Sequence, residues 1–190
     1  MTFEYSPKQF WEQRGQLYPF EIQGFSFFDF PFKSEFESKI AELKPKSILD
    51  AGCGAGRLFP LYKGVERVLA VDFSTSMLKY ASMVKLTLGL SNVEIRNFDI
   101  RDAAFIGESF DLILTRQVLM HIKPEDIKKT VDGLIGICKK NILIHEYFGA
   151  SPTLAPHNFR HDYPTLFSKL KAVEQKDVDG GIFMLLEKEA

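Results

Sequence analysis

The sequence predicts an α/β fold in which a mostly parallel sheet carries helices on both faces. From about Ser47 to the C-terminus, apolar runs of strand length alternate with segments of helical period, a pattern typical of that architecture. The chain has 190 residues, 45% of them hydrophobic, which is enough for one well-buried core and short for two. We therefore expect a single domain over residues 1–190, with residues 1–46 as an N-terminal helical and aromatic region and residues 47–190 as the core.

Seven segments are the expected strands. The closing pair is separated by Asp179-Gly180, a dipeptide that favours a tight hairpin, so these two strands are antiparallel and one strand of the sheet is reversed. The expected strands are Ser47–Asp50, Arg67–Asp72, Val93–Phe98, Phe110–Thr115, Asn141–Tyr147, Ala172–Val178 and Gly181–Glu187.

Helix signals stand between these strands and ahead of the first. Ser34 and Glu37 have the spacing of a capping box at the start of one helix. Ser74 is placed to cap the next helix and Gly89 to end it. Pro124 occupies a first-turn position of a third helix, which has an apolar face.

Composition excludes several classes of protein. With 24 basic and 25 acidic residues the formal net charge is −1, so we expect no nucleic-acid partner. No stretch approaches 18 uninterrupted apolar residues, so we expect no membrane partner. Cys53 and Cys138 lie far apart and form no C-x-x-C pair, which argues against a zinc site or disulfides. We expect a cytoplasmic protein without a metal, as a monomer or homodimer.

The most informative stretch, residues 48–57, leaves an apolar strand through three alternating glycines, Gly52, Gly54 and Gly56. Missing Cβ atoms let a backbone turn tightly and approach a ligand closely. The spacing G-x-G-x-G differs from the G-x-G-x-x-G of dinucleotide binders, and no Lys-Ser/Thr pair follows as in a P-loop. Asp50 stands directly ahead of the glycines, where its charge disfavours a pyrophosphate. This carboxylate suits a ligand with an ammonium or sulfonium group.

Two further acidic residues end the next two strands. Asp72 falls 22 positions after Asp50, near the spacing at which a carboxylate accepts hydrogen bonds from ribose hydroxyls. Phe73 and Met77 follow it and are placed to flank an adenine ring, and Asp99 is placed to accept from an adenine amino group.

These motifs together resemble those of the class I S-adenosylmethionine-dependent methyltransferases. The resemblance covers about Ser47 to Tyr147 and extends to the terminal hairpin. It rests on Asp50-x-Gly52-x-Gly54-x-Gly56, Asp72, Asp99-Ile100, Phe110-Asp111-Leu112-Ile113 and Val118-Leu119-Met120-His121-Ile122.

The resemblance implies a Rossmann-like seven-stranded sheet in the order 3-2-1-4-5-7-6 with strand seven antiparallel. It assigns the glycine loop to the methionine portion of S-adenosylmethionine, Asp72 to the ribose, and Asp99 with Ile100 to adenine. The expected cofactor-binding residues are Asp50, Gly52, Cys53, Gly54, Gly56, Asp72, Phe73, Met77, Asp99, Ile100 and Arg116.

Candidates for acceptor chemistry lie at the ends of the fourth and fifth strands and in the loop beyond. Methyl transfer needs mainly positioning and a dry pocket, and it needs a general base only when the nucleophile arrives protonated. The catalytic candidates are Glu146, His121 and His145. His145 and Glu146 are adjacent, so they face opposite sides of a strand and at most one easily enters the pocket. The expected substrate-binding residues are Tyr147, Arg160 and His161.

Two aromatic features complete the expectations. Seven phenylalanines between Phe20 and Phe36 fit no single helix face, so we expect them to divide between packing and a lid, which Trp11 and Tyr18 would join. The run 142–148 also resembles, over few residues, methylases associated with acidic-sugar biosynthesis.

The expected activity is methyl transfer to an O or N atom of a small molecule, because little chain remains for recognising a macromolecule. A protein or other macromolecule methyltransferase, and a non-catalytic S-adenosylmethionine-binding regulatory protein, remain open alternatives. An NAD-dependent dehydrogenase is a third alternative.

Overall fold

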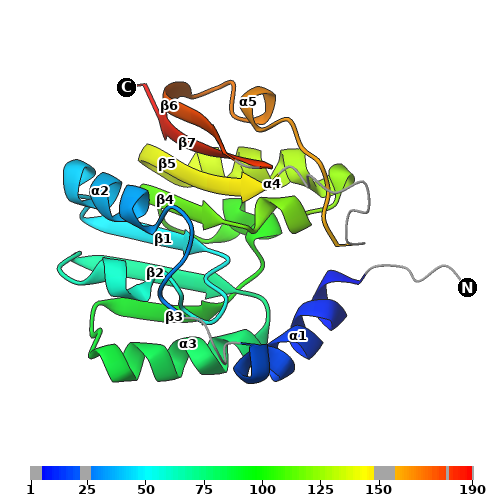
Figure 1. Cartoon of the computed structure of the whole chain (residues 1–190). Coiled ribbons are helices and arrows are strands. Elements are labelled where there is room, and N and C mark those ends of the chain that lie inside the picture. Colours follow the sequence, from blue (N-terminus) through cyan, green and yellow to red (C-terminus); the bar gives the residue numbers. More distant parts are fainter. Residues whose placement is uncertain (1–5, 22–26, 148–156, 179, 190) are drawn as a thin grey trace, which may run out of the picture.

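The structure, a computed structural model, describes residues 6–21, 27–147, 157–178 and 180–189. It contains a seven-stranded sheet in the order β3-β2-β1-β4-β5-β7-β6 (Figure 1). All neighbouring strands are parallel except that β7 is antiparallel to both β5 and β6. The expected order and the reversed seventh strand are therefore confirmed. The strands are β1 Ser47–Ala51, β2 Arg67–Asp72, β3 Val93–Asn97, β4 Phe110–Arg116, β5 Cys138–Tyr147, β6 Lys171–Val178 and β7 Gly181–Glu187.

Helices cover both faces of the sheet (Figure 1). The α-helices are α1 Pro7–Glu21, α2 Lys33–Leu43, α3 Thr75–Leu88, α4 Pro124–Ile137 and α5 Tyr163–Leu166, and the short 3-10 helices are η1 Phe59–Tyr62, η2 Ile100–Phe105 and η3 Leu119–His121.

Alternate residues of each buried strand supply two separate apolar cores. In β1, Ile48 packs in the core beneath α2, η1 and α3, whereas Leu49 packs in the core beneath η2, α4 and α5. Both side chains are almost completely buried. Burial on both faces explains why the central strands read as continuous apolar runs.

Local signals explain two of the three expected helix starts. Ser74 caps α3 by accepting from the N–H of Met77 at 3.3 Å, and Gly89 ends that helix with φ +65°. Pro124 begins α4. The capping box at α2 was wrong: Phe32, with φ +65°, precedes the helix, and the Ser34 hydroxyl donates to its neighbour Glu35.

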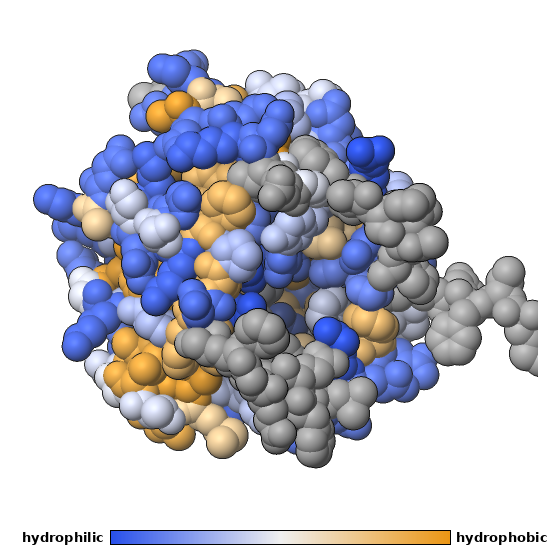
Figure 2. Space-filling model, in the orientation of Figure 1, coloured by the Kyte–Doolittle hydropathy of each residue, from blue (hydrophilic) through white to orange (hydrophobic). Residues whose placement is uncertain are grey.

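The sheet topology places the functional region at one edge. The carboxyl ends of the parallel strands meet there, and α1 lies beyond them beside α3 (Figure 1). Among the described residues no helix is long and apolar enough to cross a membrane. Figure 2 shows an apolar patch at the lower left, where α3 lies; Met83 and Leu86 on this helix are exposed.

Candidate functional site

The glycine loop follows β1 and lies against the end of β2. The N–H groups of Gly52 and Cys53 both donate to the carbonyl of Val71, at 2.9 and 2.8 Å. Gly52 has φ +87° and Gly54 has φ +53°, backbone conformations that L side chains rarely adopt. A Cβ at Gly54 would meet no atom within 4 Å, so the space above this residue is open to a ligand.

Gly56 has a different role from the one expected. Its φ is +85°, and a Cβ there would lie 2.9 Å from the ring of Phe59. Because Gly56 does not line the cavity described below, it serves the packing of the turn rather than a ligand.

Asp50, the next-to-last residue of β1, is a buried carboxylate with an unsatisfied oxygen. Its Oδ2 has no hydrogen-bond partner among the described residues. Burial raises the pKa of Asp50 to about 7; the nearby Tyr62 hydroxyl opposes this rise and the charge of Asp72 adds to it. A buried, unsatisfied carboxylate is costly unless a donor or a cation reaches it, so this atom marks the place for a positively charged ligand group.

Asp72, at the end of the adjacent β2, ties two loops together. Its Oδ2 accepts from the N–H of Gly54 at 3.0 Å and its Oδ1 accepts from the N–H of Ser74 at 2.8 Å. Burial raises the pKa of Asp72 to about 6, and these two N–H groups limit the rise. Each carboxylate oxygen has a further lone pair, so Asp72 can still accept from ligand hydroxyls.

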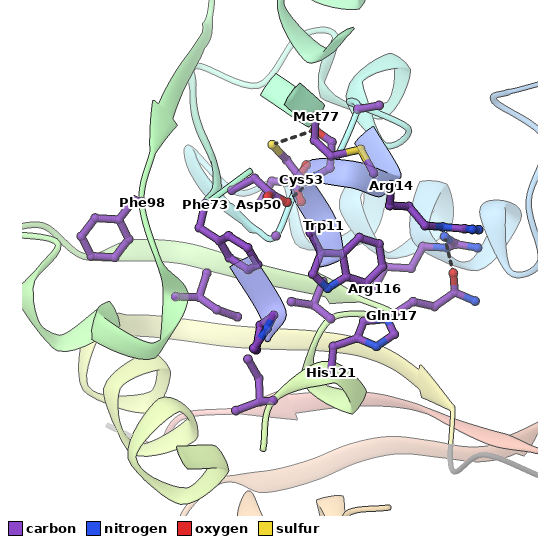
Figure 3. A pocket seen from close by; sticks show the side chains of 18 of the residues that line it. Trp11, Arg14, Asp50, Cys53, Phe73, Met77, Phe98, Arg116, Gln117 and His121 are labelled. Atoms are coloured by element: carbon purple, nitrogen blue, oxygen red, sulfur yellow. Dashed lines mark hydrogen bonds between the residues drawn. The ribbon is translucent and has the colours of Figure 1, made fainter. Parts of the chain in front are cut away.

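These groups line a cavity of about 300 Å³. Figure 3 shows Phe98 and Phe73 at one end, with Arg14, Arg116 and Gln117 at the other and Asp50 between them. The lining residues are Pro7, Trp11, Arg14, Asp50, Gly52, Cys53, Gly54, Ala55, Arg57, Leu58, Asp72, Phe73, Met77, Phe98, Ile100, Arg101, Arg116, Gln117, Val118, His121, Ile122 and Lys123. Nine of the expected cofactor-binding residues are brought together here, that is, all except Gly56 and Asp99.

Asp99 follows β3 as expected, but its carboxylate is already engaged. Arg101 donates to both of its oxygens through Nε at 3.0 Å, and Asp99 also caps η2 by accepting from the N–H of Arg101. Although burial works against ionisation, the Arg101 guanidinium holds the pKa of Asp99 below its usual value. Asp99 does not line the cavity; its neighbours Phe98 and Ile100 do.

Helix α1 covers one side of the cavity with Pro7, Trp11 and Arg14, where the sequence predicts a lid that includes Trp11 and Tyr18. The Glu12 carboxylate accepts from the N–H groups of Thr75 and Ser76 at 2.6 and 3.1 Å, at the N-terminus of α3. A Cβ at Gly15 would lie 2.7 Å from the Cβ of Ser76, so glycine permits this close approach. The side chain of Tyr18 lies outside the described part of the chain.

His121 is the one catalytic candidate that lines the cavity. Its Nδ1 lies 2.9 Å from the carbonyl oxygen of His157, and its ring meets that of Trp11 at a centroid distance of 4.8 Å. Burial lowers the pKa of His121 to about 4, which the His157 carbonyl partly offsets. Because a carbonyl only accepts, Nδ1 carries the proton of the neutral ring and Nε2 carries the lone pair.

His145 and Glu146 face opposite sides of β5, as the sequence predicts, but neither lines the cavity. His145 is fully buried against Phe32, at a centroid distance of 4.7 Å, and is the register partner of Arg116. Burial, with the charge of Arg116, lowers the pKa of His145 to about 4. Tyr147 packs on the His145 ring at 5.2 Å and lies outside the cavity as well.

Glu146 is fully buried and bonded to backbone. Its Oε2 accepts from the N–H groups of Val118 and Met120, at 3.0 and 3.3 Å. A carboxylate held in this way behind the cavity wall does not reach an acceptor in the cavity. The expected catalytic role of Glu146 therefore lacks the geometry it requires.

The loop residues expected to bind substrate are also elsewhere. Arg160 is exposed and outside the cavity, and His161 is buried with its Nε2 at 2.9 Å from the carbonyl oxygen of Ile122. His161 thus anchors the loop after β5 to the cavity wall. Within the described ranges, no group of His, Cys, Asp and Glu side chains has the arrangement of a metal site.

The residues fit the cofactor that the motifs indicate. The space over Gly54 is open to the amino-acid end of the cofactor, and the unsatisfied oxygen of Asp50 can accept from an ammonium group. Asp72 retains acceptor capacity for ribose hydroxyls, and Phe73 with Ile100 supplies apolar surface for a base.

Comparisons with known proteins agree with this site. A family described as "Methyltransferase domain" matches residues 48–141, which include the glycine turn, Asp50 and Asp72. The chain is 29% identical over 159 residues to phosphatidylethanolamine N-methyltransferase from Cereibacter sphaeroides, covering 73% of this chain and 77% of that protein. It is 27% identical over 126 residues to ubiquinone biosynthesis O-methyltransferase from Actinobacillus pleuropneumoniae serotype 7 (strain AP76), covering 63% of this chain and about half, 51%, of that relative.

Among solved structures, the chain is similar to magnesium protoporphyrin IX methyltransferase from Synechocystis PCC 6803 with bound S-adenosylmethionine. The TM-score is 0.71 at 15% identity, and the match covers 100% of both chains. At this identity the likeness concerns the fold.

Proposed function

This chain is a class I S-adenosylmethionine-dependent methyltransferase, and from that premise we propose that it transfers the methyl group to an O or N atom of a small molecule. The observation that carries the proposal is the cavity itself. It lies beneath α1, and the rest of its lining comes from the strand ends, the segments that follow them and the first turn of α3; a covered cavity of about 300 Å³ favours a small acceptor over a macromolecule.

The two ends of the cavity suggest how cofactor and acceptor share it. In this proposal Asp50 and Asp72 hold the amino-acid and ribose portions, and the adenine lies toward Phe73 and Phe98, which Figure 3 shows at the end of the cavity opposite Arg116. The acceptor then approaches from the opposite end, between Arg116 and His121. When bound, the cofactor supplies an activated methyl group, so the protein contributes positioning and exclusion of water.

His121 is the residue proposed to touch the acceptor. Its neutral ring, with the lone pair on Nε2, can accept a hydrogen bond from an incoming hydroxyl or amine and take its proton as the acceptor atom becomes positively charged during methyl transfer. Trp11 packs on this ring and keeps it in place beneath α1. The names of the two relatives, an N-methyltransferase and an O-methyltransferase, support both acceptor atoms.

The test is label transfer. The protein is incubated with methyl-labelled S-adenosylmethionine and fractions of small metabolites, of protein and of nucleic acid, with Asp72→Ala as the cofactor-binding control. We expect the methyl label in a small-molecule product, and mass spectrometry of that product identifies the methylated atom. Label that appears only in macromolecules, or cofactor binding without transfer to any fraction, contradicts it.

The role of His121 has its own test. His121→Gln is expected to lower kcat about 10²-fold or more while leaving the Kd for S-adenosylhomocysteine within about twofold. Wild-type turnover in this variant would exclude His121 as the base.

A further inference from the structure

The wall of the cavity behind the glycine turn is the segment 117–122, which follows β4. Gln117, Val118, His121 and Ile122 from this segment line the cavity. Val118 lies so close to Gly52 that a Cβ on that glycine would be 2.6 Å from both of its methyl groups. The position of this segment therefore sets the position of the glycine turn.

The segment has a backbone conformation that needs support from outside. Gln117 has φ +56°, an uncommon conformation for a residue other than glycine. The neighbouring β5 supplies the support in two ways. The N–H of Gln117 donates to the backbone carbonyl of His145 at 2.9 Å, and the N–H groups of Val118 and Met120 donate to the side chain of Glu146.

Glu146 occupies a buried place in which its main contacts are with backbone. Burial raises its pKa to about 7, against the effect of the N–H groups of residues 118–120 and the Thr115 hydroxyl on β4. The titratable group facing it is the phenol of Tyr163 on α5, and its register partner on β7 is the apolar Ile182. Backbone N–H groups of the cavity wall donate to the Glu146 carboxylate. A carboxylate at this buried position is therefore explained by the support it gives to that wall.

We propose that Glu146 is a positioning residue for methyl transfer: its carboxylate holds the turn at Val118–Met120 against the glycine loop and so fixes the shape of the cofactor cavity. Glu146 acts from behind the wall and does not touch cofactor or acceptor. The effect passes from the carboxylate to two backbone N–H groups, then through the Val118 side chain to Gly52. This inference concerns the cofactor cavity and does not depend on which acceptor is methylated.

The test is amide hydrogen exchange, with S-adenosylhomocysteine binding measured on the same proteins. In Glu146→Gln, the carboxamide presents one acceptor and an NH₂ group that cannot accept. The N–H groups of Val118 and Met120 should exchange at least about tenfold faster than in the wild type. The N–H of Gln117, which donates to a backbone carbonyl, should stay protected and serves as the internal control. Glu187→Gln, an exposed position on β7, is the matched variant and should change neither amide.

The affinity measurement decides whether the turn matters for the cofactor. Glu146→Gln should raise the Kd for S-adenosylhomocysteine about tenfold, as expected for the loss of bonds to a charged acceptor. Unchanged protection of Val118 and Met120, or freed amides with unchanged Kd, overturns the proposal. A general rise of exchange across β4 and β5 also overturns it, because that is the result of a merely structural role.

A second variant serves if Glu146→Gln does not fold. Val118→Ala keeps Glu146 and removes the methyl groups that contact Gly52, so it too should weaken S-adenosylhomocysteine binding several-fold. Wild-type affinity in Val118→Ala would overturn the proposal by itself.

Discussion

Replacing Gly52 by alanine tests the contact between the glycine turn and the wall of the cavity. Two costs add at this position. Alanine at φ +87° is strained by about 1–2 kcal/mol, and forcing its Cβ to within 2.6 Å of the Val118 methyl groups costs a further ~1–3 kcal/mol. We expect Gly52→Ala to lower the free energy of unfolding by about 2–5 kcal/mol, measured by urea denaturation without ligand.

The chain offers a matched control and a second variant that separate the two costs. Gly54→Ala has the same kind of backbone strain, with φ +53°, but its Cβ meets nothing within 4 Å, so it should cost only about 1–2 kcal/mol. Val118→Ala removes the two 2.6 Å contacts and leaves only the Val118 Cβ at 3.2 Å, so the double variant Gly52→Ala/Val118→Ala should be more stable by about 1–3 kcal/mol than the sum of the single effects predicts. Additive effects in this cycle, or equal losses for Gly52→Ala and Gly54→Ala, would refute the argument that Val118 sets the position of the turn.

Three further predictions concern the cofactor. Asp72→Ala should weaken S-adenosylmethionine binding by roughly ten- to a hundredfold in calorimetry, because about 1.5–3 kcal/mol of hydrogen bonding is lost; unchanged affinity would remove the ribose assignment. Burial raises the pKa of Asp50 to about 7 and of Asp72 to about 6, and a cationic ligand favours their ionised forms. The Kd for S-adenosylmethionine should therefore rise as pH falls through 7 and 6, by up to about tenfold per pH unit for each carboxylate. Calorimetry in buffers of different ionisation enthalpy should show that binding releases protons, and a Kd that is independent of pH from 5 to 8 would contradict this prediction. Glu12→Gln should weaken the bond between α1 and the N–H of Ser76, so the fluorescence emission of Trp11, the one tryptophan of the chain, should shift. Cofactor dissociation should accelerate, and unchanged stopped-flow dissociation rates would show that this bond does not hold α1 over the cofactor.

The strands and the glycine turn could be predicted because their signals are local. A continuous apolar run such as Val68–Val71 is dictated by burial on both faces of the sheet. Gly52 and Gly54 have the positive φ angles that the spacing of the glycines indicates. The aspartates that follow successive strands meet at one edge because parallel neighbours in the sheet bring their carboxyl ends together.

The rest depended on contacts between distant parts of the chain. Alternation along β5 correctly separates His145 from Glu146, but the local pattern does not say that the carboxylate bonds to backbone 26 or more residues earlier. The sequence suggested that Asp99 was free to accept from an adenine amino group. The guanidinium of Arg101 instead donates to this carboxylate, and the sequence does not specify the rotamer of Arg101. No local pattern predicts the hydrogen bonds of Glu12 with Thr75 and Ser76 either, because these residues lie 63 and 64 positions further along the chain.

We propose that the turn at residues 50–54 and Asp72 bind S-adenosylmethionine, and a crystal structure with S-adenosylhomocysteine tests this assignment most directly. We expect density for the amino group at Asp50, for the ribose hydroxyls at Asp72 and for the adenine beside Phe73 and Ile100. Density for the nucleoside anywhere outside this cavity, or a protein that takes up none at millimolar ligand, would contradict it.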